Sequence, residues 1–213
     1  MTYESSGSRI TEKDLQNCRG GYKFGDIPKD ENLYMGVDVG RLLHYVIRTD
    51  KKIILMGSVK DFDELCGMVK MYSIKGTVID ALPETREVQS FIKKFPRKVK
   101  MCYYTGLAEM KESKKYWNIT EDKVNTDRTV SMDMVMAEFK QREIKIPDNY
   151  DACIDFAPHL KSTTRIIIED KKGISKAGYI ETGDDHLYHS CNYAKLATNI
   201  FNTMTPEIFI INS

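Results

Sequence analysis

The chain lacks both a long hydrophobic run and an apolar segment near its start. A membrane-spanning helix needs about 20 consecutive apolar residues, and no stretch of the 213 residues approaches that length. The opening segment, MTYESSGSR, is polar and does not contain the apolar region of a signal peptide. We therefore expect a protein of the cytosol, without a membrane partner.

Cysteine pairs are also lacking. The five cysteines are an odd number, are widely scattered and include no C-x-x-C pair. In a cytosolic chain this pattern predicts reduced, mostly buried thiols, and it argues against a structural zinc site.

A strong net charge is absent as well, because the chain carries only +1. This excludes a polycation but not a local basic patch that binds phosphates. A solvated helix face or loop is the alternative interpretation of such a patch. Three basic clusters are candidates: Lys93, Lys94, Arg97, Lys98 and Lys100; Lys111, Lys114 and Lys115; and Lys171, Lys172 and Lys176.

The organisation of the chain follows from composition and periodicity. Residues 1–31 are polar and include the Gly-rich stretch CRGGYKFGDIP, which predicts an N-terminal arm or linker. Residues 32–213 are expected to form one domain. Three consecutive apolar segments over 33–59 predict an antiparallel meander. Helices and strands then alternate up to residue 105, which predicts parallel pairing and an α/β fold with a mixed central sheet flanked by helices.

The second half is less regular at first. The segments KYWNITED and KVNTDRT, within 106–128, are compatible with a hairpin. A helix is predicted over 129–144, a strand-turn-strand unit over 165–182, and a final helix from Asp184 or Asp185 to about Phe201.

Two aspartates stand at the ends of predicted strands. Asp38 lies in LYMGVDVG between Gly36 and Gly40, and Asp80 ends GTVID. A carboxylate inside a sheet is costly unless it is compensated, whereas strand ends open onto a crevice where a metal ion can compensate it. We expect the flanking glycines to leave room for a metal, water and a phosphate. Turn or helix capping is the alternative role of each aspartate.

A third polar group opens the final helix. Asp184, Asp185, His186 and His189 lie within six residues, and positions 185, 186 and 189 project on one side of a helix. Helix capping explains one aspartate but not the histidine pair.

Together these groups match the needs of phosphodiester hydrolysis. Two divalent cations about 4 Å apart activate the attacking water and stabilise the leaving oxyanion. We predict Asp38, Asp80 and Asp185 as catalytic residues, with Asp38 bridging the cations. The ions would be Mn²⁺ or Mg²⁺, and imidazole ligands favour Mn²⁺. The predicted metal ligands are Asp38, Asp80, Asp185, His186 and His189.

The order of these motifs resembles the C-terminal nuclease domain of the large terminase subunit of tailed phages and prophages. The resemblance runs from about residue 18 to 201 and is carried by YMGVDVG, GTVIDALPE, NTDRTVSMDMVMAEF followed by IKIPDN, and DDHLYHSCNYAKLA. It implies an RNase H-like fold with an added β-hairpin, expected within 106–128. It also implies metal-dependent cleavage of double-stranded viral DNA, with little sequence specificity, during genome packaging.

The same resemblance implies partners and a compartment. They are the packaging ATPase domain of the same subunit, the portal, the small terminase subunit and the host bacterial cytosol. The ATPase domain is expected to be absent, because the chain has no G-x-x-x-x-G-K-[ST] stretch. Many relatives carry H-x-x-D where this chain has His186 and His189. The third ligand therefore stays open among Asp184, Asp185, His186 and His189.

Three alternatives remain at this stage. An actin-like or sugar-kinase-like ATP-binding domain begins with a similar strand and would be stabilised by ATP. Another RNase H-like nuclease, of the resolvase or transposase type, would prefer branched DNA. A catalytically silent module would bind duplex DNA without cutting it.

Overall fold

A seven-stranded mixed sheet forms the centre of the computed structural model, which describes residues 8–105, 116–169 and 175–203. Its strand order is β4-β3-β2-β5-β6-β8-β7. The first three strands form the predicted antiparallel meander, and β2, β5, β6 and β8 run parallel. The strands are β2 (Tyr34–Val39), β3 (Leu43–Arg48), β4 (Ile53–Val59), β5 (Gly76–Asp80), β6 (Val99–Thr105), β7 (Trp117–Ile119) and β8 (Lys123–Asp127).

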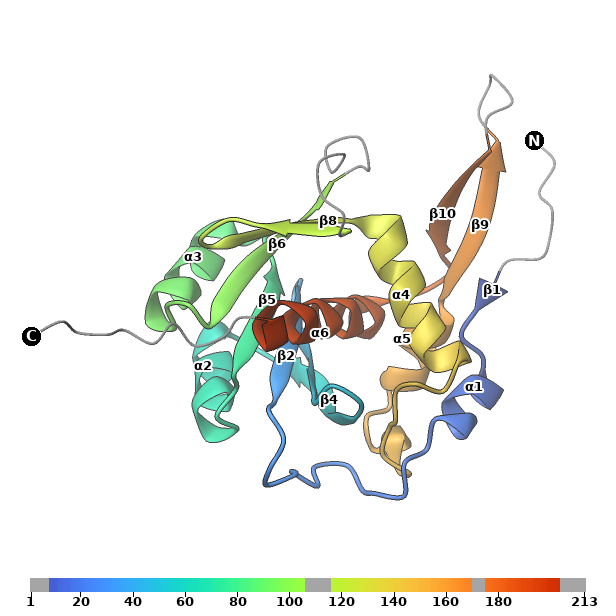
Figure 1. Cartoon of the computed structure of the whole chain (residues 1–213), viewed down its shortest axis with the longest axis horizontal. Coiled ribbons are helices and arrows are strands. Elements are labelled where there is room, and N and C mark those ends of the chain that lie inside the picture. The colour runs from blue at the N-terminus through green and yellow to red at the C-terminus, as the bar shows by residue number, and fades with distance from the viewer. Residues whose placement is uncertain (1–7, 106–115, 170–174, 204–213) are drawn as a thin grey trace, which may run out of the picture.

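A second sheet of three strands lies outside the first. Its order is β1 (Ser8–Arg9), β9 (Thr163–Glu169) and β10 (Ser175–Glu181), and the β9–β10 hairpin projects from the body of the molecule (Figure 1). A hairpin was expected within 106–128, and in the described part of that segment β7 and β8 do pair antiparallel, through Trp117↔Thr126 and Ile119↔Val124, whereas residues 106–115 lie outside the described residues. The β7 and β8 strands form an edge of the central sheet, because β8 pairs with β6 through Cys102↔Val124 and Tyr104↔Thr126. The hairpin that lies outside the central sheet is β9–β10.

Helices cover both faces of the central sheet. Met35 and Val37 of β2 pack in one core with α2 and α3, whereas Tyr34 packs with α6 on the other side. This alternation follows from the two-residue period of a strand. None of the helices in the described part of the chain is both long and apolar enough to cross a membrane. The helices are α1 (Glu12–Asn17), α2 (Phe62–Met71), α3 (Thr85–Lys94), α4 (Arg128–Lys140), α5 (Phe156–Lys161) and α6 (His186–Thr203), with a 3₁₀ turn at Tyr150–Ala152.

The long helix α6 lies directly on β2 and β5 (Figure 1). A Cβ atom at Gly36 would stand 2.1 Å from both the Ala194 nitrogen and the Ser190 carbonyl oxygen. A Cβ atom at Gly76 would stand 2.1 Å from the ring of Phe201. Gly36 therefore makes room for the backbone of α6. The expectation that it leaves space for a metal or phosphate is wrong.

The described part of the predicted arm packs against the domain. Thr11 and Asp14 form a reciprocal capping box at the start of α1. Ile10, Leu15 and Cys18 are fully buried in the core that α4, α5 and α6 share. Residues 10–18 therefore contribute to the hydrophobic core.

A buried ion triad joins three elements beside this core. Arg48 of β3 donates two hydrogen bonds, of 2.8 and 2.9 Å, to Glu138 of α4. Lys195 of α6 donates a third, of 2.8 Å, to the same carboxylate. Burial alone would raise the pKa of Glu138, but the two cations hold that pKa below its ordinary value.

Candidate metal centre

Asp38 lies near the end of β2, on the face that α6 covers. Its side chain is buried, with 7% of the residue exposed. His186, the first residue of α6, places Nδ1 2.9 Å from Oδ2 of Asp38. This hydrogen bond to the carboxylate raises the pKa of His186. The structure thus brings together two of the predicted ligands, from positions 148 residues apart.

Two further histidines surround this pair. His44 of β3 stands directly opposite Asp38 in the antiparallel register, and its ring stacks on His186 with centroids 4.4 Å apart and planes 10° apart. His159 of α5 contacts both rings edge-on, at 5.6 and 5.7 Å. Burial lowers the pKa of His44 and of His159, so both rings favour the neutral form that binds metals.

Sequence analysis missed both of these histidines. His44 had a usable signal, because a hairpin turn near Gly40 and Arg41 places residue 44 opposite residue 38. His159 reaches the cluster only through the packing of α5 against α6, which no local pattern specifies.

A second group forms around the start of α6. Nε2 of His189 lies 3.2 Å from Oδ2 of Asp185. The two atoms are not aligned as a hydrogen bond, so this buried oxygen has no hydrogen-bond partner among the described residues. On its other side, Nδ1 of His189 is 2.7 Å from the hydroxyl of Tyr104, which accepts a hydrogen bond from Asn192. Burial favours a higher pKa for Asp185, but His189 more than offsets it and the pKa is lowered.

Asp80 and Asp184 belong to neither of these two three-ligand groups. Asp80 ends β5, the strand next to Asp38, and its Oδ1 accepts a hydrogen bond of 3.1 Å from the Leu82 amide. Burial, with a contribution from the nearby charge of Asp38, raises the pKa of Asp80. Asp184 is exposed.

The arrangement fits divalent cations. Ligand atoms of Asp38, His44 and His186 lie within 4.8 Å of one another, and so do those of Glu181, Asp185 and His189. Ligands at about 2.0–2.2 Å from one ion are separated by about 3 to 4.4 Å. Two buried atoms, Nδ1 of His44 and Oδ2 of Asp185, have no hydrogen-bond partner within the described part of the chain. A cation would satisfy both, and the mixed nitrogen and oxygen donors suit a transition metal.

The central sheet has an RNase H-like topology. Carboxylates and imidazoles gather where β2 and β5 end and where α6 begins. Together these two features define a class of α/β protein with a candidate metal centre at one edge of an RNase H-like sheet. No known protein family and no curated protein matches the sequence.

Solved structures do match, and they are large terminase nucleases. The nuclease domain from bacterial virus Sf6 aligns with a TM-score of 0.59 and 8% identity, covering 87% of this chain and 97% of that one. The large terminase nuclease from thermophilic phage G20c gives 0.57 and 9%, covering 85% and 94%. The nuclease domain from Thermus phage P74-26 gives 0.53 and 9%, covering 85% and 91%. The chain therefore has the fold of these domains, and the predicted RNase H-like fold is confirmed.

Metal ions accompany several of these relatives. The G20c nuclease has structures with bound magnesium and with bound cobalt, at TM-scores of 0.53 and 0.56. A mutant Sf6 domain has one with calcium, at 0.60.

Proposed function

We propose that the chain is a divalent-metal-dependent endonuclease that cuts double-stranded viral DNA, with little sequence specificity, during genome packaging. One observation supports this proposal most strongly. Two clusters, each containing carboxylate and imidazole side chains, lie near the start of α6 in a chain that has the fold of terminase nucleases. Neither group belongs to a hydrophobic core, and each contains a buried atom that a cation would satisfy.

The residues divide the work between two cations, Mn²⁺ or Mg²⁺. Such ions, when bound, lower the pKa of the attacking water and stabilise the leaving oxyanion. Asp38 and His186 would hold one ion, and Asp185 and His189 would hold the other. Asp80, at the end of the neighbouring strand, supplies the third catalytic carboxylate. The hydrogen bonds of Tyr104 and Asn192 orient His189.

Plasmid cleavage in Mn²⁺ tests this proposal. Asp38→Ala and Asp80→Ala should each lower the rate about 10³-fold, because a catalytic metal contributes several kcal/mol to the transition state. Asp151→Ala is the matched control, since Asp151 is exposed and lies on the separate 3₁₀ turn. If both active-site variants fold and cut at the wild-type rate, the metal-site hypothesis is wrong.

Substrate form and nucleotide separate the alternatives. A packaging nuclease should cut linear and supercoiled duplex, whereas a resolvase should prefer branched DNA. ATP should leave the melting temperature unchanged, because only a nucleotide-binding domain gains stability from it. In the phage context the proposed partners are a packaging ATPase domain, the portal and the small terminase subunit, in the host cytosol.

A further inference from the structure

His44 occupies a position that packing alone does not explain. It is buried, with 8% exposed, yet its Nδ1 has no hydrogen-bond partner among the residues that the structure describes. Leaving a buried polar atom unpaired costs about 1–3 kcal/mol. The backbone of His44 cannot shift easily to relieve this cost. It is held by the pairing of β3 and by the Ser190 hydroxyl, which donates a hydrogen bond to the His44 carbonyl oxygen.

Two candidate metal ligands, Asp38 and His186, lie next to this ring. The antiparallel register places His44 beside Asp38 on the same face of the sheet. The first turn of α6 then lays His186 parallel to it, 4.4 Å away. A ring nitrogen of His44, a carboxylate oxygen of Asp38 and a ring nitrogen of His186 all lie within 4.8 Å of one another.

His159 provides the contrast within the same cluster. Its ring also touches His44 and His186, but it is not part of the three-ligand group. Its Nδ1 already accepts a long hydrogen bond, 3.4 Å, from the Leu187 amide at the start of α6. His159 therefore packs against the group without offering that nitrogen to an ion.

We infer that His44 is a third ligand, with Asp38 and His186, of one divalent cation, and that this site selects a transition-metal ion over Mg²⁺. Two imidazoles and one carboxylate form a donor set that suits Mn²⁺, Co²⁺ or Zn²⁺, whereas Mg²⁺ prefers oxygen donors only. The inference rests on the proposed metal site and adds a ligand to it from β3. The ion would then be held by side chains from three elements, β2, β3 and α6.

Pulsed electron paramagnetic resonance of the full chain with one equivalent of Mn²⁺ tests this directly, because it counts the nitrogens bound to the ion. The wild type should show two imidazole nitrogens. His44→Gln and His186→Gln should each show one and bind Mn²⁺ about a hundredfold more weakly, whereas His159→Gln should keep two. Mg²⁺ in hundredfold excess should not displace Mn²⁺ from the wild type.

The wild-type count does not depend on whether any variant folds. One nitrogen or none in the wild type, or an unchanged count in a folded His44→Gln protein, would overturn the inference. The experiment measures no cleavage, so it separates the two proposals. If the bound ion has two nitrogen ligands but the chain cuts no DNA, the proposed nuclease function is wrong and the metal site stands. If the chain cuts DNA while the ion has oxygen ligands only, the nuclease function stands and the inference about His44 is wrong.

Discussion

Gly36 controls how closely α6 approaches the sheet, and thereby where the candidate ligands meet. The strand passes under the helix at this residue, with no space for a side chain between them. Asp38 lies two residues after Gly36, on the same face of β2. His186 lies one helical turn before Ser190, where α6 contacts Gly36. The glycine thus helps to position the candidate metal ligands without contacting them.

Gly36→Ala should therefore damage both stability and the site. The new methyl group would stand 2.1 Å from backbone atoms of α6, which cannot rotate away. We expect a loss of about 3 kcal/mol in the free energy of unfolding, measured by urea denaturation, together with weaker Mn²⁺ binding. Gly67→Ala, within α2 and with nothing inside 4 Å of its Cβ, should instead stabilise the chain by about 0.5–1 kcal/mol. Equal effects of the two substitutions would contradict this role for Gly36.

Individual residues of the candidate site were predictable from the sequence where a local pattern, such as a strand end or helical spacing, indicated them. The ends of strands led to the prediction of Asp38 and Asp80, and helical spacing led to that of residues 185, 186 and 189, which the structure divides between the two groups. Which of them meets Asp38 depended on how α6 packs on β2, and the two elements approach most closely at Gly36, where a Cβ atom would stand 2.1 Å from the backbone of α6. His159 depended on long-range packing in the same way. Glu181 enters the second group from the end of β10, which no periodicity relates to α6.

At the scale of elements, the regular strands and longer helices followed from sequence, and the short ones did not. The meander, α2, α3 and α6 show clear two-residue or 3.6-residue periods. The two-residue β1 and the six-residue α1 and α5 are too short to show a period. They are stabilised by contacts with distant elements, such as the pairing of Ser8 with Arg165 and the burial of Leu15. Composition alone therefore predicted an arm or linker over residues 1–31.

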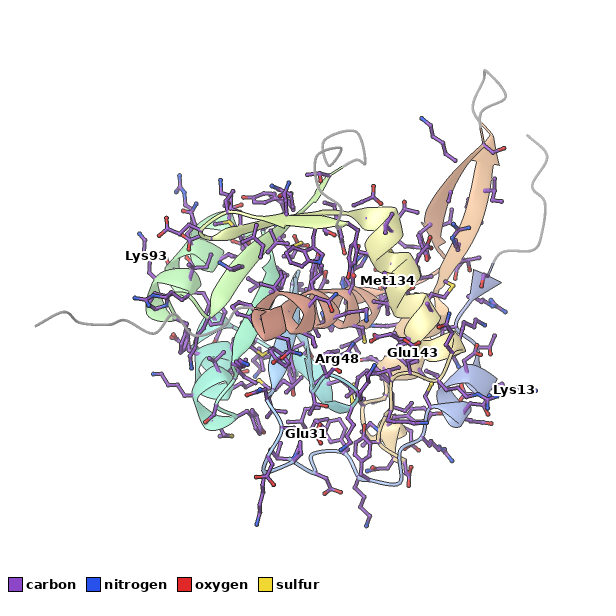
Figure 2. All side chains as sticks on the ribbon, viewed as in Figure 1. Lys13, Glu31, Arg48, Lys93, Met134 and Glu143 are labelled. Carbon is purple, nitrogen blue, oxygen red and sulfur yellow. The ribbon has the colours of Figure 1, made fainter. Side chains whose placement is uncertain are left out.

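The buried triad connects β3, α4 and α6, and it should contribute stability that depends on pH. Removing one partner of a buried ion pair leaves the other charge uncompensated, which costs about 3–5 kcal/mol. Glu138→Gln should accordingly lower the free energy of unfolding at pH 7 by about 3 kcal/mol. Glu143→Gln, at an exposed residue past the end of α4 (Figure 2), should change it by less than about 0.5 kcal/mol.

The direction of the pH effect follows from the lowered pKa of Glu138. Its stabilising contribution is fully present above the unfolded-state value of 4.5 and is lost as the pH falls through the lower folded-state value. The difference in stability between wild type and Glu138→Gln should therefore shrink as the pH falls below about 4.5. Denaturation curves at a series of pH values measure this, and a difference that grows on acidification would refute the assignment.

For the whole molecule, the charge distribution limits how DNA can bind. With a net charge of +1, attraction to a polyanion must come from local cations. The predicted basic clusters contribute unevenly: Lys100 is buried and bonds to the Glu121 carbonyl oxygen, and the clusters at 111–115 and 171–172 lie outside the described residues. Lys93 and Lys13 lie at opposite ends of the molecule (Figure 2), too far apart to form one patch.

Arg41 is the cation that we expect to meet the phosphate backbone. It is exposed in the β2–β3 turn, three residues after Asp38. Each phosphate contact releases counterions and contributes about 0.9 to the slope of log affinity against log salt. Arg41→Ala should therefore weaken duplex binding and reduce that slope by about 1, as measured by fluorescence anisotropy between 50 and 200 mM salt. Lys13→Ala removes the same charge from the exposed surface of α1 and should leave the slope unchanged. If the two substitutions reduce the salt-dependence slope equally, the cations act only through the net charge of the chain. The interpretation that DNA binds at the edge of the sheet near Asp38 would then be wrong.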